Sequence, residues 1–199
     1  MLFTQTLDLF KACLGRASNL CAIYQHLKDG TTDALNVDDL LRSAVTLTMS
    51  SFDYLIHELI KVECIYRVDN NLPLENFNVP SILLNLTEPD FSLALDAHIK
   101  TINGHKSFMA PDKVAQSLKI FLASPWNDIG AELGIDISVV KSRLKAISDW
   151  RNRIVHEADI HPDYGGTQLW PINYDDVMSS IEFIEDLGQS IALTITNNR

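Results

Sequence analysis

The chain has 199 residues, 46% of them hydrophobic, which is enough for one well-packed domain and short for two. Its formal net charge of −10 argues against a surface that coats nucleic acid, because that mode of binding needs many Lys and Arg contacts with phosphate. The sequence therefore predicts a single domain over residues 1–199, with any nucleic-acid contact confined to a local site.

Apolar residues recur at intervals of three and four along most of the chain, which is typical of amphipathic helices. A first helix is predicted over residues 2–28, before Gly30, and Asn36 is a candidate N-cap for a second helix of about 30 residues. Asp136 is the candidate N-cap of the helix at 137–158. A third helix is predicted over residues 88–104, and a final helix over about 174–196. Between them, a shorter amphipathic run begins after Pro111 and stops at Pro125, residues 126–133 are expected to form another turn or two, and residues 161–166 form a loop. This pattern predicts an all-α antiparallel bundle of long helices.

The N-terminal segment and the cysteines indicate a cytoplasmic protein. The first eight residues lack the basic start of a signal peptide, and no stretch approaches the roughly 18 apolar residues that cross a membrane. Cys13, Cys21 and Cys64 lie in helical patterns without CxxC spacing, which argues against a secreted disulfide framework and against a zinc knuckle. His57-Glu58 also lacks the second histidine of an HExxH motif, so we expect no metal site.

The helix at 137–158 contains a charge where apolar residues are expected. On a wheel of about 100° per residue, Arg151 falls in the middle of the apolar stripe. A guanidinium keeps its charge and is costly to bury, so this position predicts a carboxylate partner, a dimer interface or a solvated cleft. An arginine at a helix edge or in a structural ion pair is the alternative. The residues that define the stripe are Leu144, Ile147, Trp150, Ile154 and Val155.

Two further polar residues follow on the same helix. His156 lies five residues after Arg151, roughly 140° around the wheel, and Asn152 lies one turn before His156. The three side chains could line a shallow polar cleft if the helix end is distorted or a second subunit contributes. An ordinary surface histidine is the alternative.

Two segments resemble one known family. The run from Trp150 to Asp159 resembles the signature of the HEPN superfamily, in which an arginine and a polar residue precede a histidine. Residues 51–59, Ser-Phe-Asp-Tyr-Leu-Ile-His-Glu-Leu, resemble the corresponding helix of the HEPN branch associated with RiboL-PSP-type domains and with toxin and phage-defence loci. The resemblance implies a HEPN-like helical bundle.

The resemblance also implies an activity, namely RNA cleavage without metal or other cofactor. A 2′-hydroxyl would attack the adjacent phosphate and leave a cyclic phosphate and a 5′-hydroxyl. His156 would accept or relay a proton, Arg151 would bind the phosphate, and Asn152 would orient either the histidine or the phosphate. Arg153 is a weaker candidate for a phosphate contact. Asp53 and Glu58 are possible partners of Arg151 across the helix pair.

The expected partners are an RNA substrate and a second copy of the chain in a symmetric homodimer, with a neutralising antitoxin or regulatory protein as a further possibility. Two other functions remain open. The first is a non-catalytic HEPN module that binds RNA, a nucleotide or a protein. The second is a helical dimerisation protein unrelated to RNA, in which Arg151 would belong to a structural ion pair.

Overall fold

The computed structural model describes the chain except for residues 1, 29, 31–35, 76 and 165–167. Within this described part the all-α prediction is confirmed. The helices are α1 (Leu2–Lys28), α2 (Asp38–Asp69), α3 (Asp90–Asn103), α4 (Pro111–Leu118), α5 (Pro125–Leu133), α6 (Ile137–Glu157) and α7 (Tyr174–Asn197). Two 3-10 turns, η1 (Leu83–Asn85) and η2 (Pro162–Tyr164), and a bridge between Ile160 and Leu169 are also present.

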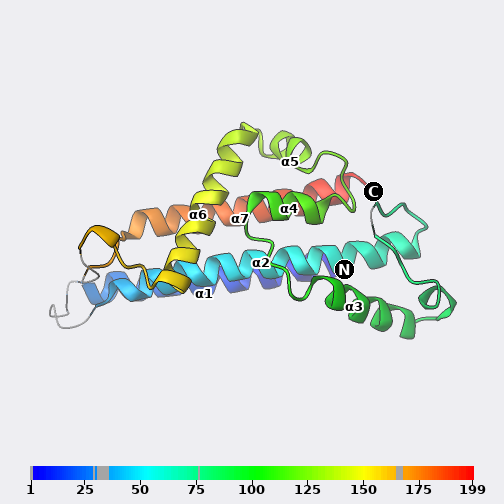
Figure 1. Ribbon diagram of the computed structural model, residues 1–199, viewed down its shortest axis with the longest axis horizontal. Coiled ribbons are helices and arrows are strands. Elements are labelled where there is room, and N and C mark those ends of the chain that lie inside the picture. The colour runs from blue at the N-terminus through cyan, green and yellow to red at the C-terminus, as the bar shows by residue number, and fades with distance from the viewer. Residues whose placement is uncertain (1, 29, 31–35, 76, 165–167) are drawn as a thin grey trace.

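The three longest helices form the body of the bundle. Helices α1 and α2 run antiparallel along the long axis of the molecule, and α7 lies beside them (Figure 1). Helix α6 crosses this layer steeply and packs against α2, α4 and α5. Burial of one apolar face on each long helix is the main source of stability in such a bundle.

A glycine allows the three long helices to meet closely. An added Cβ at Gly188 of α7 would lie 2.6 Å from Phe10 Cε1 of α1 and 2.7 Å from Leu55 Cδ2 of α2. Gly188 is buried, and Phe10 and Leu55 are both 0% exposed. Any larger residue at this position would therefore press on two fully buried side chains.

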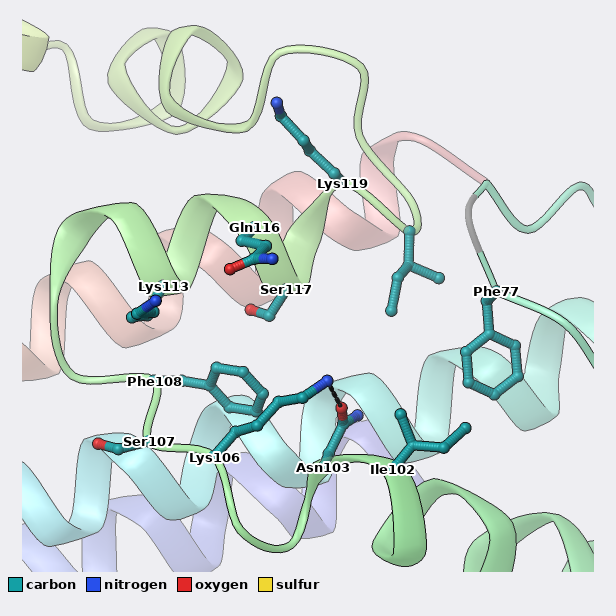
Figure 2. Close-up of a pocket in the computed structure, with 11 residues that line it drawn as sticks. Phe77, Ile102, Asn103, Lys106, Ser107, Phe108, Lys113, Gln116, Ser117 and Lys119 are labelled. Atoms are coloured by element: carbon teal, nitrogen blue, oxygen red, sulfur yellow. Dashed lines mark hydrogen bonds between the residues drawn. The ribbon is translucent and has the colours of Figure 1, made fainter.

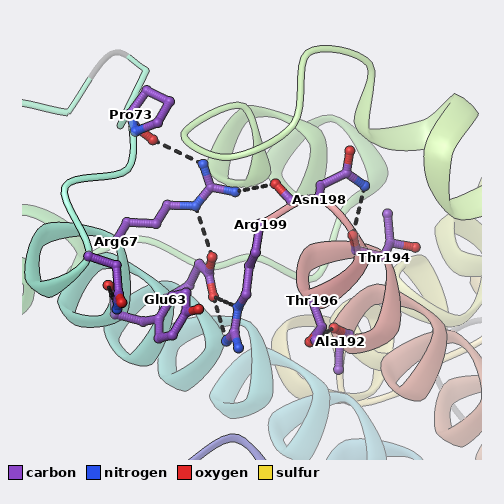
Figure 3. Close-up of polar contacts among 10 residues, drawn as sticks. Glu63, Arg67, Pro73, Ala192, Thr194, Thr196, Asn198 and Arg199 are labelled. Atoms are coloured by element: carbon purple, nitrogen blue, oxygen red, sulfur yellow. Dashed lines mark hydrogen bonds and ion pairs between the residues drawn. The ribbon is translucent and has the colours of Figure 1, made fainter.

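A buried carboxylate ties the end of α7 to α2 (Figure 3). Glu63 is 0% exposed, and its two oxygens accept from Arg67 Nε and Arg199 Nη2, each at 2.8 Å. Arg67 also donates to the backbone carbonyls of Pro73 and Asn198, each at 2.9 Å. Because both carboxylate oxygens are charge-paired and hydrogen-bonded, the buried charge is compensated.

Two helix boundaries differ from the sequence prediction. The residue before α2 is Val37 rather than the predicted cap Asn36, and no side chain caps this end. Asp38 and Asp39 lie in the first turn instead, where their charges interact favourably with the helix dipole. The helix predicted between Pro111 and Pro125 ends earlier than expected, at Leu118, because the chain leaves it in a turn in which the Phe121 amide donates to the Leu118 carbonyl.

The predicted loop at 161–166 contains the short turn η2 in its described portion, and residues 165 and 166 lie outside the described residues. None of the described helices is long and apolar enough to span a bilayer.

Candidate active site

Helix α6 carries the residues singled out in the sequence, and both of its ends are well defined. At the start, the Asp136 carboxylate accepts hydrogen bonds from the Ser138 hydroxyl and from the Ser138 backbone N–H, which confirms the predicted N-cap. These hydrogen bonds lower the pKa of Asp136. At the other end, Ala158 and Asp159 adopt left-handed conformations with φ of 51° and 55°, which stop the helix after Glu157.

The apolar stripe of α6 is covered over its first part only. Its buried residues are Val140, Leu144, Ile147 and Ser148. Trp150 and Ile154 are half-buried, and Val155 is 45% exposed, so the prediction that Val155 belongs to the buried stripe is wrong. The wheel places Val155 on the stripe, but the described residues leave nearly half of its surface uncovered in the last turns of α6.

Arg151 is half-buried, and its charge is not paired with an acid in the described part of the chain. Its Nη1 donates to Asn152 Oδ1 at 3.1 Å, while its Nε is buried without a hydrogen-bond partner. The two carboxylates proposed from the sequence are engaged elsewhere. Asp53 accepts from the Phe108 backbone N–H at 2.5 Å, and Glu58 pairs with Lys61. The structure therefore brings Arg151 to Asn152 and leaves Asp53 and Glu58 on other partners.

His156 lies in the last turn of α6 and is exposed to solvent. None of the described contacts joins its imidazole to Arg151 or Asn152. The spacing along the helix explains this arrangement, because five residues rotate the side chain well away from Arg151. Within one chain the two groups therefore stand apart on the surface of α6.

A charged cluster next to this site was not predicted from the sequence. Asp159 is 0% exposed and accepts from Arg153 Nε at 2.7 Å and from Arg42 Nε at 2.8 Å. Arg42 also donates to the Trp170 carbonyl at 2.7 Å, and the Arg153 guanidinium lies 4.7 Å from the centre of the Trp170 ring. We call these four residues the Asp159 cluster. It fixes the turn that follows α6, three residues after His156.

The cluster changes the interpretation of Arg153. Its guanidinium is held by the carboxylate of Asp159 and the ring of Trp170, so a phosphate contact would compete with both. The Arg42 and Arg153 side chains share the single carboxylate of Asp159, so the cluster holds two arginines and one acid. The only signal in the sequence was that an aspartate ends the run from Trp150 to Asp159.

A groove runs between α2 and the end of α6, with a volume of about 540 Å³. Arg42, Ser43, Thr46, Ile154 and Asp159 are among its lining residues, whereas Arg151 and His156 are not. The two key side chains of the motif thus lie outside this groove. No group of three or more His, Cys, Asp or Glu side chains in the described part of the chain has the arrangement of a metal site.

Comparisons with known proteins agree with the fold. The family model RiboL-PSP-HEPN matches residues 12–197, which include the α2 segment at 51–59 and the whole of α6. No significant match was found among curated proteins or among solved structures. Because the matched region takes in nearly every helix described above, the chain belongs to the RiboL-PSP-HEPN family, a HEPN family linked to ribonuclease activity.

Proposed function

We propose that this protein is a metal-independent endoribonuclease whose active site is formed by Arg151, Asn152 and His156. The observation that supports the proposal best is the unpaired guanidinium nitrogen of Arg151. Its Nε is a buried donor without an acceptor, although the chain has 26 acidic residues. An unpaired buried donor on a permanent cation is unfavourable in the free protein and is satisfied by an anionic ligand such as phosphate.

A neighbouring hydrogen-bond donor is also buried without a partner. The buried polar atoms without a partner in the described residues include Trp150 Nε1 as well as Arg151 Nε. Both belong to the motif segment of α6. Polar groups left unpaired in this way are a recognised feature of functional sites, where the missing partner is a ligand or another chain.

The residue types fit cleavage by the 2′-hydroxyl. A neutral His156 imidazole accepts the 2′-hydroxyl proton while the 2′-oxygen forms a bond to the adjacent phosphorus. Arg151 stabilises the negative charge that builds on the phosphate oxygens, and Asn152 holds the guanidinium through the hydrogen bond described above. The bond from phosphorus to the 5′-oxygen then breaks, and a protonated imidazole supplies the proton of the 5′-hydroxyl product. The other product is a 2′,3′-cyclic phosphate.

A second copy of the chain completes this site. Two imidazoles around one cleft would provide both the base and the acid, and a single chain offers one His156 that contacts neither Arg151 nor Asn152. The uncovered Val155 beside His156 supports an interface at the end of α6. A two-fold axis there would bring the two motif segments together, which is the usual form of a homodimer.

The biological role that fits such an enzyme is that of a toxin or a phage-defence component. A ribonuclease that acts on cellular RNA must be restrained in the healthy cell. We therefore propose a neutralising antitoxin or a regulatory protein as an additional partner.

The proposal is tested by incubating the purified protein with total cellular RNA in the presence of EDTA and then analysing the ends of the products. We expect cleavage to continue under chelation and to give 2′,3′-cyclic phosphate and 5′-hydroxyl ends, because the mechanism uses only protein side chains. Cleavage that stops with EDTA and returns with Mg²⁺ would refute it. RNA binding without any cleavage would instead support a non-catalytic HEPN module.

A further inference from the structure

A second candidate site lies away from the motif, in a cavity between α4 and the connection that follows α3 (Figure 2). Its volume is about 690 Å³, within the range of about 300–1,000 Å³ that is usual for pockets that bind small organic ligands. None of its lining residues belongs to α6 or to the Asp159 cluster. The cavity is therefore a separate feature of the molecule.

The charge of this cavity is opposite to that of the protein. Lys106, Lys113 and Lys119 line it, and its lining includes no aspartate or glutamate. In a chain with a net charge of −10, such a concentration of lysines favours an anionic ligand. The Lys106 ammonium points into the cavity, whereas the Lys119 side chain turns away from it (Figure 2). Lys113 lines the cavity as well, and its ammonium lies 3.8 Å from the exposed Asp112 carboxylate. Lys106 is thus the main cation of the cavity, with Lys113 as the second.

A buried amide adds a second, independent observation. Asn103 is only 5% exposed, and its Oδ1 accepts from Lys106 Nζ at 3.0 Å. Its Nδ2 makes none of the hydrogen bonds found among the described residues, although it belongs to the cavity lining. The Asn103 amide and the Lys106 ammonium lie side by side in Figure 2. Together they present hydrogen-bond donors to one point, as a phosphate group requires.

One end of the cavity is apolar. Phe77 and Ile102 lie together at the end opposite Lys113 (Figure 2). Both are half-buried, so part of each side chain is accessible to a ligand. An aromatic and an aliphatic side chain of this kind pack against a flat ring. The cavity therefore offers a cationic part and an apolar part within the length of one small molecule.

We propose that this cavity binds a free nucleoside monophosphate. The phosphate is held by Lys106, Lys113 and the Nδ2 group of Asn103, and the base packs against Phe77 and Ile102. A phosphate and a planar ring separated by one sugar match both parts of the cavity, and its volume suits one nucleotide. The proposal does not depend on RNA cleavage, because none of these residues belongs to the motif.

The test is isothermal titration calorimetry of the full chain with AMP, adenosine and inorganic phosphate. We expect AMP to bind at least about tenfold more tightly than either fragment, because only AMP uses both parts of the cavity. Lys106→Gln removes one charge and is expected to raise the Kd of AMP by about tenfold, the scale of one charge-assisted hydrogen bond. Lys11→Gln changes an exposed lysine on α1 and should leave the Kd unchanged.

Three outcomes would overturn the proposal. The first is the absence of AMP binding at millimolar concentration in a wild-type protein that melts cooperatively. The second is an unchanged Kd in Lys106→Gln protein with a wild-type melting temperature. The third is a short RNA that binds more tightly than AMP and loses that advantage in Lys106→Gln, because this result would assign the cavity to the RNA chain rather than to a free nucleotide.

Discussion

Asp159 holds the charged side chains that lie next to the motif. Its side chain is 1% exposed and receives two arginines, Arg42 from α2 and Arg153 from α6. It also stands in a left-handed conformation with φ of 55°, which is unfavourable by about 1–2 kcal/mol for a residue with a Cβ. The ion pairs therefore hold a strained turn in place, directly after the helix that carries His156.

Substitution of this aspartate tests the cluster. Asp159→Ala would leave Arg153 without an acid and Arg42 with only the exposed Asp39, 3.4 Å from its Nη1. We expect the free energy of unfolding to fall by about 3–5 kcal/mol. The exposed pair of Lys145 and Asp149 on the same helix provides the control, and Asp149→Ala should change stability by no more than about 0.5 kcal/mol. Urea unfolding of both variants measures the difference. Equal losses in the two variants would show that the cluster contributes no more than a surface ion pair.

Some features of single residues could be predicted from the sequence, and others could not. Arg151 was identifiable as an anomaly because helical periodicity is local and places it among apolar neighbours. Its lack of an acidic partner was not, because Asp53 and Glu58 find other partners through contacts with Phe108 and Lys61. The bond from Arg42 to Asp159 joins residues 117 positions apart, and no local pattern indicates such a contact.

At the scale of elements, the long helices were predictable and their ends less so. The predicted bounds of 2–28 and 137–158 agree closely with Leu2–Lys28 and Ile137–Glu157. Repeating apolar residues and a capping aspartate define such helices locally. The cap proposed at Asn36 was wrong, because α2 begins with two aspartates and needs no capping side chain. Short polar residues occur at caps and in turns alike, so their presence fixes a boundary only approximately.

Two glycines in long helices give a matched test of the packing between α1, α2 and α7. Gly188→Ala would insert a methyl group against Phe10 and Leu55, and we expect it to lower the free energy of unfolding by about 1–3 kcal/mol. Gly15 in α1 has no atom within 4 Å of an added Cβ, so Gly15→Ala should raise stability by about 0.5–1 kcal/mol through helix propensity. Thermal and urea unfolding report both effects. A stabilised Gly188→Ala protein would mean that the three helices are less tightly packed than described.

At the scale of the whole molecule, a net charge of −10 confines any binding of RNA to places where cations are left without acids. The end of α6 is such a place. The all-α bundle was predictable from periodicity, and so was the position of the motif within it. In the proposed dimer, the relation between Arg151 and His156 would depend on a second copy of the chain, which the periodicity of one sequence does not position.

Two exposed valines at opposite ends of α6 test the proposed dimer. Val155 is 45% exposed beside His156, and Val139 is 54% exposed near the start of the helix. A charge in an apolar interface is unfavourable, so Val155→Asp should shift the protein from dimer to monomer and reduce cleavage, whereas Val139→Asp should do neither. Sedimentation velocity at micromolar concentration measures the mass. A wild-type monomer that cleaves RNA would contradict the proposed interface.

The central claim, that His156 performs the proton transfer in RNA cleavage, is tested most directly by the cleavage rate of His156→Ala. The exposed imidazole packs against no part of the core, so the variant should keep its melting temperature and its oligomeric mass. His26→Ala, at an exposed histidine in the last turn of α1, is the matched control. We expect His156→Ala to cleave RNA on the order of 100-fold more slowly than wild type, or slower still, while His26→Ala retains the wild-type rate. A folded His156→Ala protein that cleaves RNA at the wild-type rate would contradict the account.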